Sequence, residues 1–492
     1  MRPPSRRSLG RSAWLPAILL VLGFALVALR PLARTDLSGV YDDTDERRFH
    51  YPTVQGFLFD TEPVRSLWDT CSSTTPLYHL LLAGAGRILG IEPLEAPRTC
   101  AELKTLPIDR LPQAPPGMRS VHLGVSLGAV LLALMLLARR GRPWQALLLA
   151  AIPAASIYFL GPAVRLSTDN LALFLVFAVL WVLDGSTPPS PRRILVAAGL
   201  AALAVLTRQV HLWLAGWLLL VPWWENGASE GPGRRRFWIR ALLALLPVVA
   251  LVPFGVAWGH LVGPAFFERH ASALNNRVFA YVLALVGLYA PFFLPWLIAA
   301  VRERPAGRGR WPTWIFGILV GLSAASFLHA PLYRVTHGRV SLEGAIRWVG
   351  VSPGPDPWCA DPGIGGPHGC DPTFQGGTLW RLSGWVDGLV GWMPWGNATL
   401  FFPLVLAGCV VVYVLARDAV ARRDAGPLLA LLLWMGANLP SERCYQKYYE
   451  PFVLFLLVWF VARRSTERRW WLAFPAALLV VQLTLAIHRF YL

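Results

Sequence analysis

The sequence predicts an all-α polytopic membrane protein, and two observations support this fold class. Of 492 residues, 55% are hydrophobic and only 15% are charged, with a mean hydropathy of +0.48, whereas about a quarter of a soluble domain is charged. Apolar runs long enough to cross a bilayer recur from one end of the chain to the other, which is typical of transmembrane helices. We therefore treat residues 1–492 as a single transmembrane domain.

Window length and flanking charge predict about 13 spanning helices. The first of them follows the basic segment Arg2–Arg11 and has no convincing small-residue cleavage site, which favours a retained signal anchor. The expected ranges are 13–30, 119–138, 144–160, 169–184, 194–207, 209–224, 240–262, 278–300, 312–330, 399–416, 427–440, 446–462 and 470–488.

Arginine clusters follow every second apolar run. With a cytoplasmic N-terminus, all six clusters fall on the cytoplasmic side, as the positive-inside rule requires. The formal net charge of +17 is thus divided among short clusters and forms no single patch, so we expect no nucleic-acid partner. The clusters are Arg139-Arg140 with Arg142, Arg192-Arg193, Arg234–Arg236, Arg302–Arg310, Arg422-Arg423 and Arg463–Arg469.

The two longest loops, 31–118 and 331–398, fall on the outer side. Within the first, Pro76–Ile91 is apolar but only about 15 residues long, and a crossing there would move all later arginine clusters outside. We expect an amphipathic helix on the outer leaflet, with Thr74 or Thr75 as its N-cap. The second loop is rich in Pro, Gly and Trp, which predicts irregular structure.

Five of the six cysteines fall in outer loops. Cys359 and Cys370 close a short Pro/Gly-rich loop, and Cys71 with Cys100 forms a second candidate pair. Disulfides in an oxidising compartment are the prediction, and buried free thiols are the alternative.

An unusual acid cluster follows the first apolar run, where Asp42, Asp43, Asp45 and Glu46 occupy four of five positions among aromatic residues. A carboxylate within reach of an acceptor hydroxyl can act as a general base, whereas the alternative for such a charge run is a solvated helix face. Asp43-Thr44-Asp45 is also a D-x-D pattern, which can hold a divalent cation with a sugar phosphate. We expect no resident cofactor and leave a divalent cation open.

Polar residues elsewhere on the outer side are candidates for substrate binding. Arg208 stands out because Thr207–His211 interrupts a nearly continuous apolar stretch, and a polar cluster there is costly unless it faces an interface or a cavity. Arginine can bind a phosphate through two parallel hydrogen bonds. Asp169, which opens a helix, is either a capping residue or a second acid at the same site. The full set is Arg208, Gln209, His50, Trp68, Asp69, Asp169, Arg269, His270, Arg443 and Lys447.

The first outer loop resembles that of the α-1,2-glucosyltransferases, which add the terminal glucose to the dolichol-linked oligosaccharide. The similarity lies in Asp45-Glu46, Phe49-His50 with Pro52, Trp68-Asp69, Thr74–Pro76 and Tyr78, and it extends thinly to Pro116–Arg119, Ser167–Asn170, Leu206–Gln209 and Tyr445–Pro451. This family belongs to the GT-C class of polytopic glycosyltransferases that use lipid-phosphate sugars.

The resemblance implies a GT-C-type bundle and an inverting glycosyltransferase in which Asp45 is the base and Glu46 the close alternative. The donor would be a polyprenyl-phosphate-linked sugar, and the acceptor a glycan or a lipid-linked molecule. A bacterial inner membrane with a periplasmic active face is the expected location, and membrane lipids are further partners. A transporter or flippase, and a glycan ligase or polymerase, are the competing hypotheses.

Overall fold

The structure is a computed structural model, and the chain forms two compact units, residues 1–268 with 458–492 and residues 269–457. Within these, the structure describes residues 14–33, 45–59, 67–68, 70–92, 99–107, 110–184, 190–226, 234–264, 277–303, 311–328, 335–336, 339–340, 398–422, 424–440, 446–464 and 469–491. Apart from one short two-stranded ladder, the regular structure of these residues is helical.

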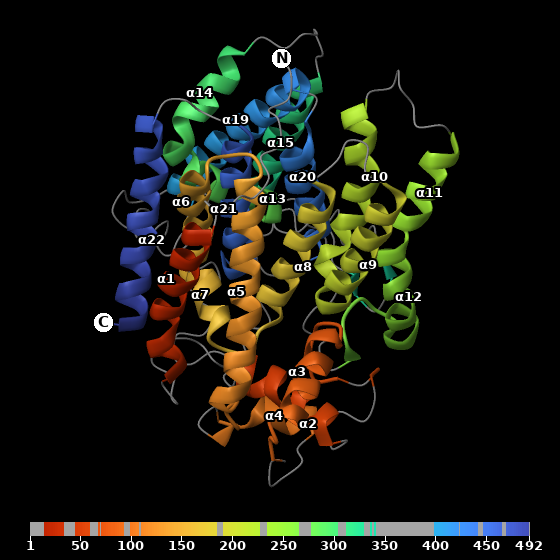
Figure 1. Ribbon diagram of the computed structural model, residues 1–492. Helices are drawn as coiled ribbons and strands as arrows, with labels where there is room; N and C mark the ends of the chain where they lie inside the picture. Colours follow the sequence, from red (N-terminus) through yellow and green to blue (C-terminus); the bar gives the residue numbers. More distant parts are fainter. Residues whose placement is uncertain are drawn as a thin grey trace. The chain divides into compact units, whose positions relative to one another are not determined.

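The first unit contains the acid cluster's described part and most of the helices (Figure 1). Its elements are α1 (Trp14–Ala33), η2 (Glu46–His50), α2 (Tyr51–Phe59), α3 (Leu77–Ile88), α4 (Cys100–Thr105), α5 (Pro116–Ala138), α6 (Pro143–Ala155), α7 (Ile157–Ala163), α8 (Thr168–Leu183), α9 (Pro191–Thr207), η4 (Gln209–Leu212), α10 (Trp213–Asn226), α11 (Arg234–Ala244), α12 (Leu246–Trp258), η9 (Arg469–Leu472) and α22 (Ala473–Tyr491). It also takes the end of α21 from Val458 onward.

One end of this unit gathers the short helices of loop 31–118. Helices α2 and α3 pack on each other, and α3 contacts α5 and α9, so that α2, α3 and α4 lie together beyond the long helices (Figure 1). We call this the first-loop end. Because α5 and α8 begin here and α9 ends here, their terminal polar residues can meet.

The opposite end of the unit is where α5, α8 and α21 finish, and we call it the arginine end. Asp184, which follows α8, is bound by Arg140 at 2.6 Å and by Arg463 at 2.9 Å. These arginines belong to two clusters that the charge pattern assigns to one side of the membrane. The end of α22 meets the end of α1 instead, where the Tyr491 hydroxyl donates to the Leu26 carbonyl oxygen at 3.0 Å. Both pairings agree with the alternation expected from the sequence.

The second unit is built on the pair α13 and α19, against which α15 packs. Its elements are α13 (Arg277–Tyr289), η7 (Ala290–Phe293), α14 (Leu294–Arg302), α15 (Trp311–Leu328), β1 (Val335–Thr336), β2 (Arg339–Val340), α19 (Ala398–Arg422), α20 (Gly426–Ala437) and the first part of α21 (Gln446–Arg463). A Cβ on Gly287 would lie 1.9 Å from the Leu404 carbonyl oxygen, and one on Gly408 2.0 Å from that of Leu283. Only glycine at both positions permits this close crossing.

Each of the thirteen ranges predicted to span the membrane contains helix. Six helical stretches are long and apolar enough to cross: Trp14–Leu32, Pro116–Ala138, Trp238–Trp258, Val278–Arg302, Phe402–Arg422 and Arg469–Tyr491. A seventh is the pair α6 and α7, which bends by 72° at Ser156. Helices Thr168–Leu183, Gln209–Val221, Pro312–Leu322 and Gly426–Ala437 are apolar but shorter. The described part of the chain is therefore that of a multi-pass membrane protein.

Local geometry departs from the sequence prediction in three places. The surface helix has Pro76 as its N-cap with no side-chain capping bond; the Thr75 hydroxyl is engaged elsewhere, donating to the Val205 carbonyl oxygen at 2.9 Å. The expected range 240–262 is divided by Leu245 into α11 and α12, because Pro247 starts a new helix. Loop 331–398 contains the antiparallel ladder of β1 (residues 335–336) with β2 (residues 339–340).

Candidate functional site

A buried ion pair joins the first outer loop to α5 at the first-loop end. The Arg119 Nε lies 3.1 Å and 3.3 Å from the two carboxylate oxygens of Glu46, and a second guanidinium nitrogen also donates to this carboxylate. The Leu166 backbone N–H donates to the same carboxylate at 2.7 Å. The side chains of Glu46 and Arg119 are 0% and 1% exposed. This buried pair fastens η2 to α5 and to the segment before α8.

A second ion pair at this end joins Asp169 in the first turn of α8 to Arg208, which follows α9. Ser167, the N-cap of α8, donates its hydroxyl proton to Asp169 Oδ2 at 2.7 Å. The positive end of the helix dipole also favours a carboxylate here. The side chains of Arg208 and Asp169 are 19% and 15% exposed. This pair is therefore accessible to solvent, whereas the Glu46–Arg119 pair is buried.

Tyr78 and His122 form a buried polar link between α3 and α5. His122 Nε2 lies 2.6 Å from the Pro162 carbonyl oxygen and must donate, so His122 Nδ1 accepts from the Tyr78 hydroxyl at 3.2 Å. Burial, and secondly the charge of Glu46, raises the pKa of Tyr78 well above its usual value. Tyr78 therefore stays a neutral phenol that can donate this bond.

His50 and His79 form a second pair nearby, with His50 Nδ1 and His79 Nε2 3.0 Å apart. Burial, and secondly the neighbouring His50, lowers the pKa of His79 well below its usual value, so His79 is neutral. The buried His79 Nδ1 has no hydrogen-bond partner among the described residues. A bare acceptor costs less than an orphaned N–H, so His79 Nε2 donates to His50.

The loop after Trp68 docks against the site through Gln209. Its side-chain amide donates to the Ser73 carbonyl oxygen at 3.1 Å and to the Leu261 carbonyl oxygen at 2.9 Å. Gln209 therefore fixes the backbone beside Arg208. The Trp68 ring lies 4.9 Å from the Phe254 ring, and the Trp68 carbonyl oxygen accepts from Trp258 Nε1 at 2.6 Å.

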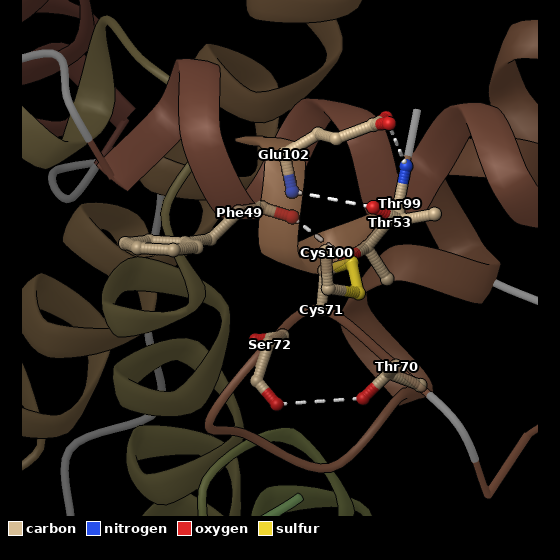
Figure 2. The surroundings of a disulfide bond; sticks show 8 residues. All are labelled: Phe49, Thr53, Thr70, Cys71, Ser72, Thr99, Cys100 and Glu102. Atoms are coloured by element: carbon tan, nitrogen blue, oxygen red, sulfur yellow. Dashed lines mark hydrogen bonds between the residues drawn. A yellow bond between two sulfur atoms is a disulfide. The ribbon is translucent and has the colours of Figure 1, made fainter. Parts of the chain in front are cut away.

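A disulfide between Cys71 and Cys100 holds this loop, and it is the pairing that the sequence predicts (Figure 2). The two Cα atoms lie 5.4 Å apart. Cys100 opens α4, whose start is fixed by a capping box in which Thr99 and Glu102 bond each other's backbone N–H. Leu103 and Leu111 pack around Cys71. The disulfide therefore ties the segment that docks on Gln209 to the helix beside η2.

Removing this disulfide by Cys71→Ala with Cys100→Ala should lower the free energy of unfolding. The bond joins residues 29 apart in sequence, and closing a loop of this length stabilises a fold by about 3.6 kcal/mol. Thermal unfolding in detergent, with and without a reductant, measures the effect. A melting temperature equal to that of the wild type under oxidising conditions would contradict the prediction. Cys409→Ala, at a buried cysteine of α19 outside this disulfide, is the control.

The predicted site residues thus fall into three groups. The structure brings Glu46, His50, Trp68, Asp169, Arg208 and Gln209 to the first-loop end, with Asp45 half-buried at the start of η2. Lys447 lies in the second unit, where its ammonium is 5.1 Å from the Tyr448 ring centre. Outside the described residues lie Asp42, Asp43, Asp69, Arg269, His270, Arg443, Cys359 and Cys370.

The described residues include only Asp45 of the D-x-D pattern. No group of three or more His, Cys, Asp or Glu side chains among them could hold a metal ion. Asp43, one of the two acids of the D-x-D pattern, lies outside this part of the chain.

Two of the buried contacts of the site could not be predicted from the sequence. Glu46 and Arg119 are 73 residues apart, and Tyr78 and His122 are 44 apart, so no local pattern indicates either pairing. Ser167 could have been recognised, because a serine two residues before an acid at a helix start is a common capping signal.

Comparisons with known proteins give distant structural similarities. No protein-family model and no curated protein matches the chain. One similar structure is the S. cerevisiae protein O-mannosyltransferase Pmt1-Pmt2 complex bound to the sugar donor, at 17% identity and a TM-score of 0.37 over 52% of this chain. The chain spans about a third (34%) of that protein's length.

ArnT from Cupriavidus metallidurans is also similar, in two structures. The form bound to undecaprenyl phosphate matches at 16% identity and a TM-score of 0.37, over 92% of this chain and 79% of that one. The apo form matches at 17% identity and a TM-score of 0.36, over 92% and 78%. Likeness at this level assigns neither family nor activity, so we base the proposal on the chain's own residues.

Proposed function

We propose that the chain is an inverting glycosyltransferase of the GT-C type, which moves a sugar from a polyprenyl-phosphate-sugar donor to a hydroxyl of a glycan or lipid-linked acceptor. The observation that carries this proposal is the accessible Asp169–Arg208 pair, which shares one end of the first unit with the start of η2. Arg208 is a cation suited to binding phosphate, and Asp169 is the carboxylate paired with it.

The reaction would be a single displacement. The acceptor oxygen forms a bond to the anomeric carbon of the sugar while the bond from that carbon to the phosphate oxygen breaks, which inverts the anomeric centre. The hydroxyl proton passes to Asp45, and the bonding electrons leave on the lipid phosphate, whose added negative charge Arg208 stabilises. No other co-reactant is needed.

Asp45 suits the role of base better than Glu46. Glu46 is fully buried, and its carboxylate is occupied by Arg119 and the Leu166 N–H, so an acceptor hydroxyl would have to displace these donors. Asp45 precedes it at the start of η2 and is half-buried. In this proposal Glu46 is a positioning residue that holds the helix bearing Asp45.

The proposed location is a bacterial inner membrane, with about 13 crossings and the first-loop end facing the periplasm. Arginines of the clusters assigned to the cytoplasm meet at the arginine end of the first unit. The disulfide lies at the other end, which fits an oxidising compartment.

A transporter or flippase is the alternative from another functional class. Such proteins use ionisable groups near the membrane midplane, whereas the two ion pairs of the site lie at helix ends. A glycan ligase or polymerase would use similar chemistry but a preassembled glycan as donor.

The test is a donor panel. The purified protein is mixed with an acceptor glycan and a series of undecaprenyl- or dolichyl-phosphate sugars, with and without EDTA, and release of the lipid phosphate is measured. We expect one donor class to react, and Arg208→Ala to reduce its kcat/KM by about 10²–10³-fold, because the cation contacts charge that develops in the transition state. Full activity of Arg208→Ala, or lipid scrambling without sugar transfer, would refute this assignment.

A further inference from the structure

The two ion pairs described at the first-loop end differ in solvent exposure, which suits them to different roles. Both join an arginine to a carboxylate, but the Glu46–Arg119 side chains are 0% and 1% exposed, whereas those of Asp169 and Arg208 are 15% and 19% exposed. A sealed pair cannot change partners without opening the fold. The accessible pair can exchange its partner with a ligand.

Asp169 is held in place by groups other than Arg208. The Ser167 hydroxyl donates to its Oδ2 at 2.7 Å, and the N-terminus of α8 favours its negative charge. If the Arg208 side chain turned away, Asp169 would keep a hydrogen bond and a favourable field. Losing Arg208 therefore leaves no isolated buried charge.

The backbone of Arg208 is fixed independently of its side chain. Its N–H donates to the Ala204 carbonyl oxygen at 2.8 Å, and its carbonyl oxygen accepts from the His211 N–H at 3.1 Å. The next residue, Gln209, is anchored to two carbonyl oxygens. The guanidinium can thus change its partner while its attachment point stays in place.

We propose that Asp169 occupies Arg208 whenever the phosphate position is empty, yields it to the lipid phosphate of the donor, and reclaims it when product leaves. This inference rests on the proposed function. It assigns to Asp169 the role of an internal competitor that limits how tightly lipid phosphate is bound.

The difference in charge between the donor and the product lipid phosphate explains why a competitor for Arg208 would be useful. The phosphodiester of a polyprenyl-phosphate sugar has one negative charge, whereas a phosphate monoester has about 1.5–2 negative charges near pH 7. The product lipid phosphate therefore binds Arg208 more tightly than the donor does, which would slow turnover at product release. A carboxylate that returns to Arg208 opposes this trapping.

The competitor model predicts that Asp169→Asn raises the affinity for undecaprenyl phosphate, whereas a positioning role for Asp169 predicts that the same substitution lowers it. With Asp169→Asn the internal competitor is gone, so undecaprenyl phosphate should bind about tenfold more tightly, since apparent affinity scales with the fraction of protein whose site is open. Multiple-turnover rate should fall about tenfold through slow release, while single-turnover rate changes less than about threefold. If Asp169 only orients Arg208, binding weakens.

The experiment uses the full-length protein in lipid nanodiscs and undecaprenyl phosphate as probe, with affinity measured by titration and both kinetic regimes followed. Asp169→Glu, which keeps the charge, should restore an affinity within about threefold of wild type. Weaker binding by Asp169→Asn overturns the competitor role but leaves the proposed function standing. No loss of binding by Arg208→Ala would instead remove the phosphate site itself. Melting temperatures identify any variant that fails to fold.

Discussion

Asp45→Asn is expected to lower the turnover number by about 10²–10⁴-fold, which is the usual contribution of a general base. The amide has nearly the same shape as the carboxylate but cannot accept the proton of the acceptor hydroxyl at neutral pH. Donor binding should change little, because Arg208 rather than Asp45 contacts the phosphate in the proposed complex. The measurement is the initial rate of lipid-phosphate release at saturating donor, together with the affinity for undecaprenyl phosphate.

The neighbouring acids supply the matched controls for this result. Asp42→Asn and Asp43→Asn remove the same charge within three residues of Asp45, so they separate a specific base from the general effect of a negative loop. We expect each to retain at least about a tenth of the wild-type rate, because in this proposal neither carboxylate receives the acceptor proton and a charge acting at longer range is screened by salt. A large loss in either variant, with Asp45→Asn active, would move the base to that residue.

The sequence predicts the helices well and their breaks poorly. Periodic apolar runs locate helices such as α5 (Pro116–Ala138) and α8 (Thr168–Leu183) to within a few residues, because burial in lipid or protein demands such runs. The break between α6 and α7 at Ser156 and that between α11 and α12 at Leu245 lie inside uninterrupted apolar sequence. Pro153 and Pro247 are the signals that could have indicated them.

For the site, sequence could nominate residues but not their partners. The sequence indicates Asp169 as a helix-start acid and Arg208 as a cation within an apolar stretch, yet nothing in either motif indicates that they pair. Asp45 and Glu46 are adjacent and chemically alike. Successive helical residues point in different directions, and only the packing of η2 against α5 determines that Glu46 is the buried one.

That buried pair leads to the second large prediction, which concerns stability. Arg119→Ala should lower the free energy of unfolding by about 3–5 kcal/mol, because it leaves the Glu46 carboxylate buried without its counter-charge. Removing both charges with Glu46→Gln and Arg119→Met should cost less than the two single substitutions together, since neither charge is then orphaned. The double-mutant cycle consists of the wild type, Glu46→Gln, Arg119→Met and the double variant, and thermal unfolding of these four proteins in one detergent measures it.

Arg208→Ala is the matched control, because it removes the same side chain from a pair that is 15% and 19% exposed rather than sealed. Water can solvate the remaining Asp169 carboxylate, and Ser167 still donates to it, so stability should fall by only about 1 kcal/mol. For activity we expect the reverse order: loss of the Asp169–Arg208 pair should reduce turnover more than loss of the Glu46–Arg119 pair. The folded fraction of Glu46→Gln should keep much of its turnover, whereas Arg208→Ala should lose nearly all of it. A Glu46→Gln protein of wild-type stability and negligible turnover would make Glu46 part of the reaction rather than of the scaffold.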